Sequence, residues 1–282
     1  MELQQSAIYA EYIRSLGWIV EQIEDQYIYI KKLPFIRAIV KIQRVKKLPS
    51  ITKLLPILRR NNVGTLAIEP DCKIRDSTLT EWLSKIPSDI KINTDYFLPT
   101  KTIRINLTPR LDMIFHSFSE AKRRAVRRAI KNGISIYESN DIYTFIHIKS
   151  IAAGFLGSIT TFGLDKLWPL FFPKNASILL ATTPSGKIVG GILLLYWNHL
   201  AYYWVAGATR EGKKLFAPTL LIWKALELAK SKNCTDLDFV GIWDTRLPTQ
   251  NRQWLGFTKF KEGFGGYDVI YPLSIPLGHT TE

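Results

Sequence analysis

Arg210, Lys213 and Lys214 form a basic cluster directly ahead of a predicted helix over 219–232. The first N–H groups of a helix are free and its dipole is positive at that end, so cations placed there favour an anion such as a phosphate. A solvated basic loop is the alternative interpretation. The cluster is therefore a candidate anion site.

A second set of cations lies on a predicted helix over 118–132. Ser117 and Glu120 have capping-box spacing, and Gly133 is placed to end the helix. Lys122 alone falls within the apolar arc, where it would need an anion or a carbonyl unless it snorkels to solvent. The opposite arc carries five cations that either bind phosphates, with a salt-dependent affinity, or are simply solvated: Arg123, Arg124, Arg127, Arg128 and Lys131.

Patterns for nucleophilic or metal-dependent chemistry are missing from the sequence. Cys72 and Cys234 lie far apart without C-x-x-C spacing, which argues against a disulfide framework or a zinc site and fits a reducing compartment. The histidines lack any H-E-x-x-H spacing, and we interpret all four as structural or exposed: His116, His147, His199 and His279.

Composition excludes a disordered chain and points to an anionic partner. The 282 residues are 46% hydrophobic, and 38 Lys+Arg against 24 Asp+Glu give a formal charge of +14. The start, Met1–Ser6, has neither a basic nor an apolar signal region, so we expect a cytoplasmic protein. The most apolar stretch, 192–207, is interrupted by Asn198-His199 and is too short to span a bilayer, so it predicts two buried strands.

Hydrophobic periodicity predicts a mixture of helices and strands, hence an α+β fold. Asp238 falls within a predicted central strand, and Tyr202, Tyr203 and Trp204 fall on another, where they line either a groove or the core. The predicted helices cover 7–16, 50–60, 79–83, 118–132 and 219–232. The predicted strands cover 27–30, 38–45, 63–68, 101–107, 178–182, 188–197, 201–206 and 237–241, with a closing hairpin across 254–271.

The order of meander, basic loop, buried helix and strand is that of GNAT acyltransferases. Beyond this order, several segments resemble the FemABX family, whose members are aminoacyl-tRNA-dependent transferases that build peptidoglycan interpeptide bridges. The matching segments, in the family's order, are Ile42–Arg44 with Ile68–Pro70, Pro99–Leu107 with Ser119–Ile134, Ala217–Lys230 with Asp238–Ile242, and Phe260–Gly266.

This resemblance implies two GNAT-like subdomains, each a mixed, mostly antiparallel sheet flanked by helices, with the acceptor in a cleft between them. We predict their bounds as 1–135 and 136–282, with a C-terminal tail that packs back on the first. The implied donor is aminoacyl-tRNA, used as a co-substrate without a cofactor. The implied acceptor is a peptidoglycan precursor, either lipid-linked or UDP-linked.

The resemblance also implies that Phe260 and Lys261 lie at the reaction centre. An amine of the precursor would attack the aminoacyl ester directly, so no serine or cysteine nucleophile is required. Lys261 would stabilise the negative charge that develops on the ester oxygen. Asp238 would orient the amine or accept its proton, or else bond a neighbouring backbone N–H. The predicted substrate-binding residues are Phe260, Lys122, Arg123, Arg127, Trp243 and Tyr203, and the predicted anion- or tRNA-binding residues are Arg124, Arg128, Lys131, Arg210, Lys213 and Lys214.

The chain departs from the family at two points. Ala152-Ala153-Gly154-Phe155 lacks the arginine that often precedes the family's Gly-Phe pair, which removes one expected phosphate contact. A charged heptad segment for a coiled-coil arm is also missing from the sequence.

Two other functions stay open. The first is a GNAT N-acyltransferase that uses acyl-CoA on a cell-envelope amine, although the 210–214 loop does not match Q/R-x-x-G-x-G/A. The second is a non-catalytic module that binds RNA or an anionic surface. For the main hypothesis we also consider peripheral contact with the inner face of the cell membrane.

Overall fold

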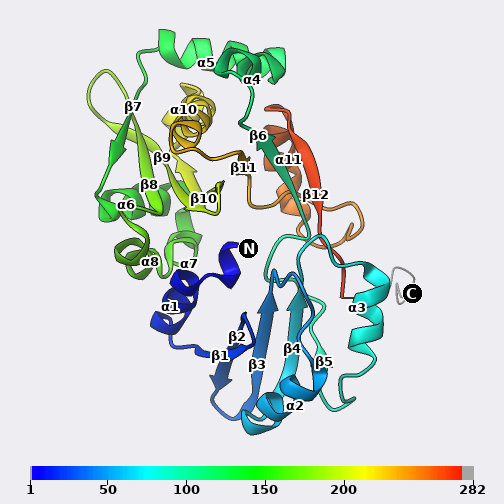
Figure 1. The fold of residues 1–282 in the computed structure, drawn as a ribbon. Helices are drawn as coiled ribbons and strands as arrows, with labels where there is room; N and C mark the ends of the chain where they lie inside the picture. The colour runs from blue at the N-terminus through cyan, green and yellow to red at the C-terminus, as the bar shows by residue number, and fades with distance from the viewer. Residues whose placement is uncertain (1, 275–282) are drawn as a thin grey trace. The chain divides into compact units, whose positions relative to one another are not determined.

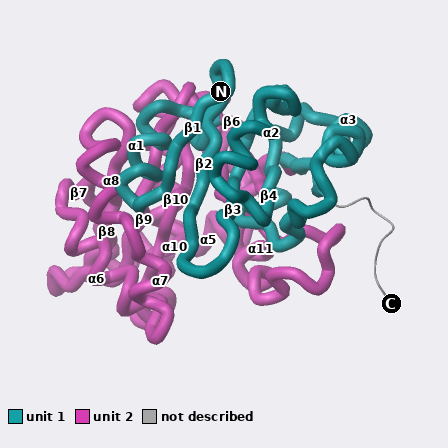
Figure 2. Tube along the Cα trace, turned by 90° about the horizontal axis from the view of Figure 1, so that it is seen from below, with its two compact units in different colours: residues 1–101, 269–282 teal, residues 102–268 magenta. Residues whose placement is uncertain are grey.

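The computed structural model describes residues 2–274, and the chain divides into two compact units (Figure 2). Unit 1 comprises Met1–Lys101 with Val269–Glu282, and unit 2 comprises Thr102–Asp268. Each unit holds one mixed sheet with flanking helices (Figure 1), so the predicted α+β class with two sheets is confirmed. The division falls at 101/102 and not at the predicted 135, because the segment after Lys101 pairs and packs within unit 2.

Unit 1 is built on a five-stranded sheet of order β1-β2-β3-β4-β5. The first three strands are antiparallel and the last two join in parallel. The strands are β1 (Ile19–Ile23), β2 (Gln26–Leu33), β3 (Ile36–Gln43), β4 (Val63–Glu69) and β5 (Lys91–Ile92). The helices are η1 (Leu3–Gln5), α1 (Ala7–Ser15), α2 (Ile51–Arg60) and α3 (Asp76–Leu83).

The N-terminal segments that resemble the FemABX family form a buried polar network in unit 1. The Gln43 amide donates to the Glu69 carboxylate at 2.7 Å, and this carboxylate also accepts from the backbone N–H of Leu98 at 2.8 Å. Arg44 stacks on the Tyr271 ring at 3.3 Å and donates to the Pro99 carbonyl at 2.6 Å. These residues hold the ends of β3 and β4 together.

Residues after Val269 complete unit 1. The Ser274 hydroxyl donates to the Ile68 carbonyl at 2.6 Å, and the Tyr271 N–H donates to the Thr100 carbonyl at 2.9 Å. The tail thus packs on the first unit up to Ser274, and the remainder of the predicted tail, 275–282, lies outside the described residues.

Unit 2 is built on a seven-stranded sheet of order β12-β6-β11-β10-β9-β8-β7. The strands are β6 (Lys101–Asn106), β7 (Ser135–Ser139), β8 (Ala176–Thr182), β9 (Ile188–Trp197), β10 (Leu200–Ala208), β11 (Asp236–Asp238) and β12 (Tyr267–Ile270). The helices are α4 (Leu111–Ser117), α5 (Glu120–Lys131), α6 (Ile142–Ala153), η2 (Gly154–Leu156), α7 (Gly157–Thr161), α8 (Leu164–Phe171), α9 (Arg210–Lys214), α10 (Ala217–Ser231), η3 (Arg252–Trp254) and α11 (Leu255–Glu262).

Helices α6 and α10 cover opposite faces of the seven-stranded sheet (Figure 1). A Cβ added at Gly190 would meet Leu221 of α10 at 3.3 Å, whereas one added at Gly191 would meet Phe145 of α6 at 3.0 Å. Neighbouring strand residues point to opposite faces, so the two glycines let both helices approach β9 closely. The predicted meander and the predicted helix at 219–232 correspond to β8, β9, β10 and α10.

The segment predicted as a closing hairpin is different in the structure. Residues 255–262 form α11, and only 267–270 form a strand. Phe257 and Phe260 are three positions apart, a helical spacing that places both rings on one face of α11. The cap of α5 also differs, because the Ser119 hydroxyl and not that of Ser117 accepts from the Lys122 N–H.

Candidate functional site

A cavity opens in unit 2 where β10 and β11 diverge. The two strands pair in parallel only from Leu200↔Asp236 to Tyr202↔Asp238. Beyond that pair, β11 ends and β10 continues past an irregularity between Tyr203 and Val205. Pairing between β10 and β11 therefore ends at Tyr202, and the next residue of β10, Tyr203, lines a cavity of about 520 Å³.

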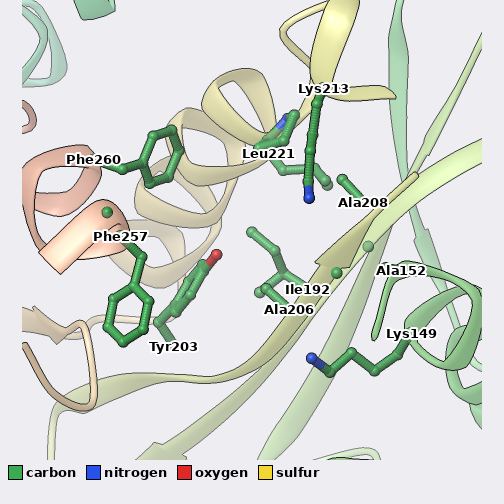
Figure 3. Close-up of a pocket in the computed structure, with 14 residues that line it drawn as sticks. Lys149, Ala152, Ile192, Tyr203, Ala206, Ala208, Lys213, Leu221, Phe257 and Phe260 are labelled. Carbon is green, nitrogen blue, oxygen red and sulfur yellow. The ribbon is translucent and has the colours of Figure 1, made fainter. Parts of the chain in front are cut away.

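The walls of this cavity come from five elements: α6, β9, β10, the α9–α10 segment and α11. Most of the lining is apolar, with two lysines and one tyrosine hydroxyl as its polar groups (Figure 3). Apolar walls with a few placed polar groups are typical of ligand pockets. The lining residues with a charged or aromatic side chain are Lys149, Tyr203, Lys213, Phe257 and Phe260.

Tyr203 presents its hydroxyl to the cavity (Figure 3). Burial raises the pKa of this phenol, so it stays protonated and can donate. The ring is held by an edge contact with Phe239, with ring centroids 5.7 Å apart. The tyrosine predicted to bind substrate thus lies in the cavity wall with a donor aimed at the interior.

Lys149 and Lys213 bring two cations to the same cavity from different elements. Figure 3 shows Lys149 reaching in from α6 and Lys213 from α9. Burial lowers the pKa of Lys149, and the positive charge of Lys213 lowers it further. Two cations that repel each other favour an anion between or beside them.

Gly212 fixes the position of Lys213. A Cβ at Gly212 would lie 2.3 Å from the Val189 carbonyl oxygen, so only glycine lets α9 pack this closely on β9. The Thr209 hydroxyl caps α9 by accepting from the Gly212 N–H at 3.1 Å. The predicted basic loop is therefore a short helix with a fixed geometry.

The first turn of α10 offers less to an anion than the sequence predicts. Pro218 has no N–H, and the N–H groups of Thr219 and Leu220 both bond to the Phe216 carbonyl, at 3.1 and 3.3 Å. The groups available to bind an anion here are therefore the lysines of the cavity more than the helix N–H groups.

Lys261 lies on α11 with a side chain that is 8% exposed. Its ammonium donates to the carbonyls of Phe239 at 2.9 Å and Gly241 at 2.5 Å. Burial lowers its pKa to about 8, while the negative charge of Asp238 acts in the opposite direction. Nζ is 4.7 Å from the centre of the Phe257 ring and 5.9 Å from that of Tyr203, two rings that line the cavity. A buried positive charge thus stands behind this wall.

Lys122 contacts the Phe260 ring of the same wall. Its Nζ is 3.7 Å from the centre of the Phe260 ring and 5.1 Å from that of Phe264. Burial lowers the pKa of Lys122 to about 8. The sequence predicts that Lys122 points inward, and its ammonium there contacts aromatic rings and not a carbonyl.

Asp238 is buried at the end of β11 with its carboxylate fully engaged. One oxygen accepts from the Thr102 hydroxyl at 2.6 Å and from the Val240 N–H at 2.7 Å, and the other accepts from the Arg104 guanidinium at 2.8 Å. These bonds favour the structural alternative, because a general base needs an oxygen that can reach its substrate.

The other predicted site residues lie outside the cavity lining. On α5, Arg124 pairs with Glu120 at 2.8 Å and Arg123 donates to the Phe118 carbonyl at 2.6 Å. The Trp243 indole N–H donates to the Gln250 carbonyl at 3.2 Å and so braces its own loop. The residues of this group are Arg123, Arg124, Arg127, Arg128, Lys131, Arg210, Lys214 and Trp243.

Sequence reasoning missed two lysines. Lys149 sits in an apolar helix that the sequence did not predict, and only its isolation among apolar residues marks it. In unit 1, Lys41 lies 3.5 Å from the centre of the Phe97 ring and 4.6 Å from that of Trp18. Burial lowers the pKa of Lys41 to about 8, against the influence of Glu69. The sequence signal that could have identified Lys41 is its position on the face of β3 opposite the core.

Among residues 2–274, the structure groups no set of three or more His, Cys, Asp or Glu that could hold a metal ion. The candidate chemistry therefore rests on the lysines, the tyrosine and the aromatic wall.

The chain has a GNAT-like fold, which it shares with several solved structures. FemX has the same fold, with a TM-score of 0.73 at 16% identity over 96% of this chain and 90% of FemX. The C-terminal domain of a candidate lysylphosphatidylglycerol synthetase from Agrobacterium fabrum gives a TM-score of 0.62 at 11% identity, over 93% of this chain and 85% of that one. A tandem GNAT protein from the clavulanic acid biosynthesis pathway gives 0.52 at 11% identity, over 89% and 79%.

Part of the sequence also matches a family model. The FemAB family model matches residues 175–271, which include β8–β10, α10 and α11. The resemblance to the FemABX family is therefore confirmed. Comparison with curated protein sequences finds no match to this chain.

Proposed function

We propose that this protein transfers an amino acid from aminoacyl-tRNA to an amine of a peptidoglycan precursor, forming an interpeptide bridge. The observation that carries the proposal is the cavity beside β10. Its walls from β9, β10, α9, α10 and α11 all fall within the segment that matches the FemAB family. In this proposal the cavity binds the donor end of the aminoacyl-tRNA.

The size and polarity of the cavity suit such a donor. A volume of about 520 Å³ accommodates a terminal nucleoside with its aminoacyl ester. Lys149 and Lys213 would bind phosphate, and the apolar wall of Phe257 and Phe260 would take the base or the amino-acid side chain.

The chemistry needs positive charge and donors more than a nucleophile. The acceptor amine attacks the ester carbonyl, a C–N bond forms, the ester C–O bond breaks, and the ribose hydroxyl leaves with a proton from the amine. The Tyr203 hydroxyl can donate to the oxygen that becomes negative, and the Lys261 ammonium stabilises the same charge from behind the wall.

An acyl-CoA donor is the alternative within the same fold. A coenzyme A pyrophosphate is usually bound by free N–H groups at the start of the helix that follows this strand. Here α9 fills the loop, and the first N–H groups of α10 bond to Phe216. Because of these bonds, we rank an acyl-CoA donor below aminoacyl-tRNA.

The deciding experiment incubates the protein with a muropeptide precursor and either charged tRNAs or acetyl-CoA, and measures the precursor's mass. Separate arms use UDP-linked precursor, lipid-linked precursor and phosphatidylglycerol as acceptors, the last because of the lysylphosphatidylglycerol synthetase fold relative. A gain of one amino-acid residue only with charged tRNA supports the proposal. An acetyl gain, or no gain on any precursor, contradicts it.

A further inference from the structure

Residues 150–164 of unit 2 form an apolar segment that runs from the last turn of α6 to the first residue of α8. It contains no Asp, Glu, Lys or Arg. Five of its large side chains face solvent: Phe155 is 100% exposed, Ile159 72%, Phe162 71%, Ile151 53% and Leu156 52%. So many exposed large apolar residues in one short segment mark a surface that binds something.

The backbone of this segment is suited to a low-dielectric environment. It continues from α6 through η2 into α7, so helical hydrogen bonds satisfy most of its polar groups. The hydroxyls of Thr160 and Thr161 both donate to the Gly157 carbonyl, at 3.1 and 2.9 Å. Burial of the segment would therefore leave these side-chain groups satisfied.

Two observations point to a bilayer as the occupant. Phe155 is completely exposed and lies next to Gly154, so it forms a projecting knob, which lipid chains accept without a matching groove. Cations also follow the segment: Lys166 and Lys174 stand against one acid, Asp165, between residues 150 and 174. An apolar centre with a cationic border complements an anionic lipid surface.

We propose that residues 150–164 dock this protein on an anionic phospholipid bilayer, with Phe155, Ile159 and Phe162 inserted at the headgroup boundary. Within the described chain, one helical stretch, 142–161, has the length and apolar composition of a membrane span. It lies in the interface instead, because Phe145 and Ile148 are buried in unit 2 and Gly154, at φ 59°, interrupts the helix.

The docking surface adjoins the cavity. Ala152 lines the cavity and Phe155 is three residues further along, so about one helical turn separates them. The next step alone rests on the proposed function. If that function holds, the acceptor reaches the cavity from the membrane and is lipid-linked. The docking itself needs no transfer activity.

Vesicle sedimentation tests the docking directly. The full chain is mixed with phosphatidylcholine vesicles or with phosphatidylcholine/phosphatidylglycerol vesicles, and a phosphatidylserine mixture excludes headgroup-specific recognition. We expect binding to both anionic mixtures. The triple variant Phe155→Ser/Ile159→Ser/Phe162→Ser should lose binding by at least roughly tenfold, since each loss of buried apolar surface weakens partitioning.

Ile130→Ser is the matched control, because Ile130 is an exposed apolar residue on the basic helix α5, 57% exposed. It should bind vesicles like the parent. Absence of vesicle binding by the parent chain, equal binding by the triple variant, or an equal loss in Ile130→Ser would overturn the proposal. So would size-exclusion data in which the triple variant converts a dimer to a monomer without changing vesicle binding.

A second readout locates the insertion. A polarity-sensitive fluorophore on Phe155→Cys, in a chain with Cys72→Ser, should shift to the blue on anionic vesicles, whereas the same label on Ile130→Cys should not. The remaining cysteine, Cys234, is buried. A failed transfer assay with a positive fluorescence result would leave the docking intact and remove only the proposed function.

Discussion

The Lys261 ammonium donates to the Gly241 carbonyl at 2.5 Å and thereby ties helix α11 to the loop that follows β11. The same ammonium donates to Phe239, so one buried cation holds both sides of the turn where the central strand ends. The turn contains Val240 at φ 53° and Gly241 at φ 110°, a backbone that needs such support. Lys261 thus links α11, which carries the aromatic wall of the cavity, to the turn that follows β11.

Replacement of this lysine should abolish transfer. Lys261→Met keeps the apolar stem but removes the charge, and we expect the transfer rate to fall by roughly a hundredfold or more. Two carbonyls lose their donor, which costs about 1–3 kcal/mol of folding free energy per group. Thermal denaturation therefore accompanies the rate measurement. Lys259→Met, at an exposed position on the same helix, is the control. Near-parental activity of folded Lys261→Met would contradict the role.

The rate should also depend on the ionisation of Lys261. Burial lowers its pKa to about 8, so the stabilising positive charge is present below that pH and is lost above it. We expect transfer to decline as the pH rises through 8. In Lys261→Arg, whose side chain stays charged, this decline should vanish even if the overall rate is lower. A decline of the same shape in the arginine variant would assign it to another group, such as the acceptor amine.

The two cavity lysines should govern donor affinity and its salt dependence. Lys149→Gln and Lys213→Gln should each weaken aminoacyl-tRNA binding and reduce the slope of log K against log salt by about one. Lys214→Gln is the matched control, because Lys214 neighbours Lys213 on α9 but does not line the cavity. Filter binding at several salt concentrations measures both quantities. An effect of Lys214→Gln equal to that of Lys213→Gln would indicate diffuse surface attraction.

Gly212→Ala should displace α9, which forms part of the cavity wall. The added methyl would meet the Val189 carbonyl at 2.3 Å, so α9 must move and Lys213 with it. We expect a loss of about 1–3 kcal/mol in the free energy of unfolding, together with weaker donor binding. Gly256→Ala is the control for stability, since a Cβ there meets nothing within 4 Å. Chemical denaturation of both variants gives the comparison, and equal stabilities would refute the packing argument.

Lys41 gives unit 1 a pH-dependent stability. Burial lowers its pKa from the usual 10.5 to about 8, so the folded state disfavours the charged form. This penalty is complete below about pH 8 and is relieved as the pH rises toward 10.5. Lys41→Met should therefore flatten the rise in unfolding free energy over that window. Lys32→Met, at an exposed position, should keep the parental slope, and an unchanged slope in Lys41→Met would rule out Lys41 as the source of the pH dependence.

The sequence predicted the elements whose periodicity is strong and local. The meander and α10 follow from alternating or near-continuous apolar runs between turn residues, and Pro218 marks the start of the helix. Helix α11 was mistaken for part of a hairpin because aromatic residues and the glycines near its end resemble strand and turn signals. The i, i+3 spacing of Phe257 and Phe260 was the better guide.

The site was harder to predict because it depends on contacts between distant segments. Lys149 on α6 and Lys213 on α9 are 64 positions apart in the chain and meet only because Gly207 and Gly212 let their helices approach the sheet. No local pattern shows that β10 and β11 diverge after Tyr202. Family resemblance pointed to Phe260 and Lys261, whereas the cavity itself required the three-dimensional structure.

The return of residues 269–274 to unit 1 affects the order in which the chain can fold during synthesis. Ile68 and Thr100 leave the ribosome early, but their partners Ser274 and Tyr271 are among the last described residues to be made. Unit 2, by contrast, is one continuous stretch, Thr102–Asp268. Nascent unit 1 must therefore wait for the whole of unit 2 to be translated before its own last hydrogen bonds can close.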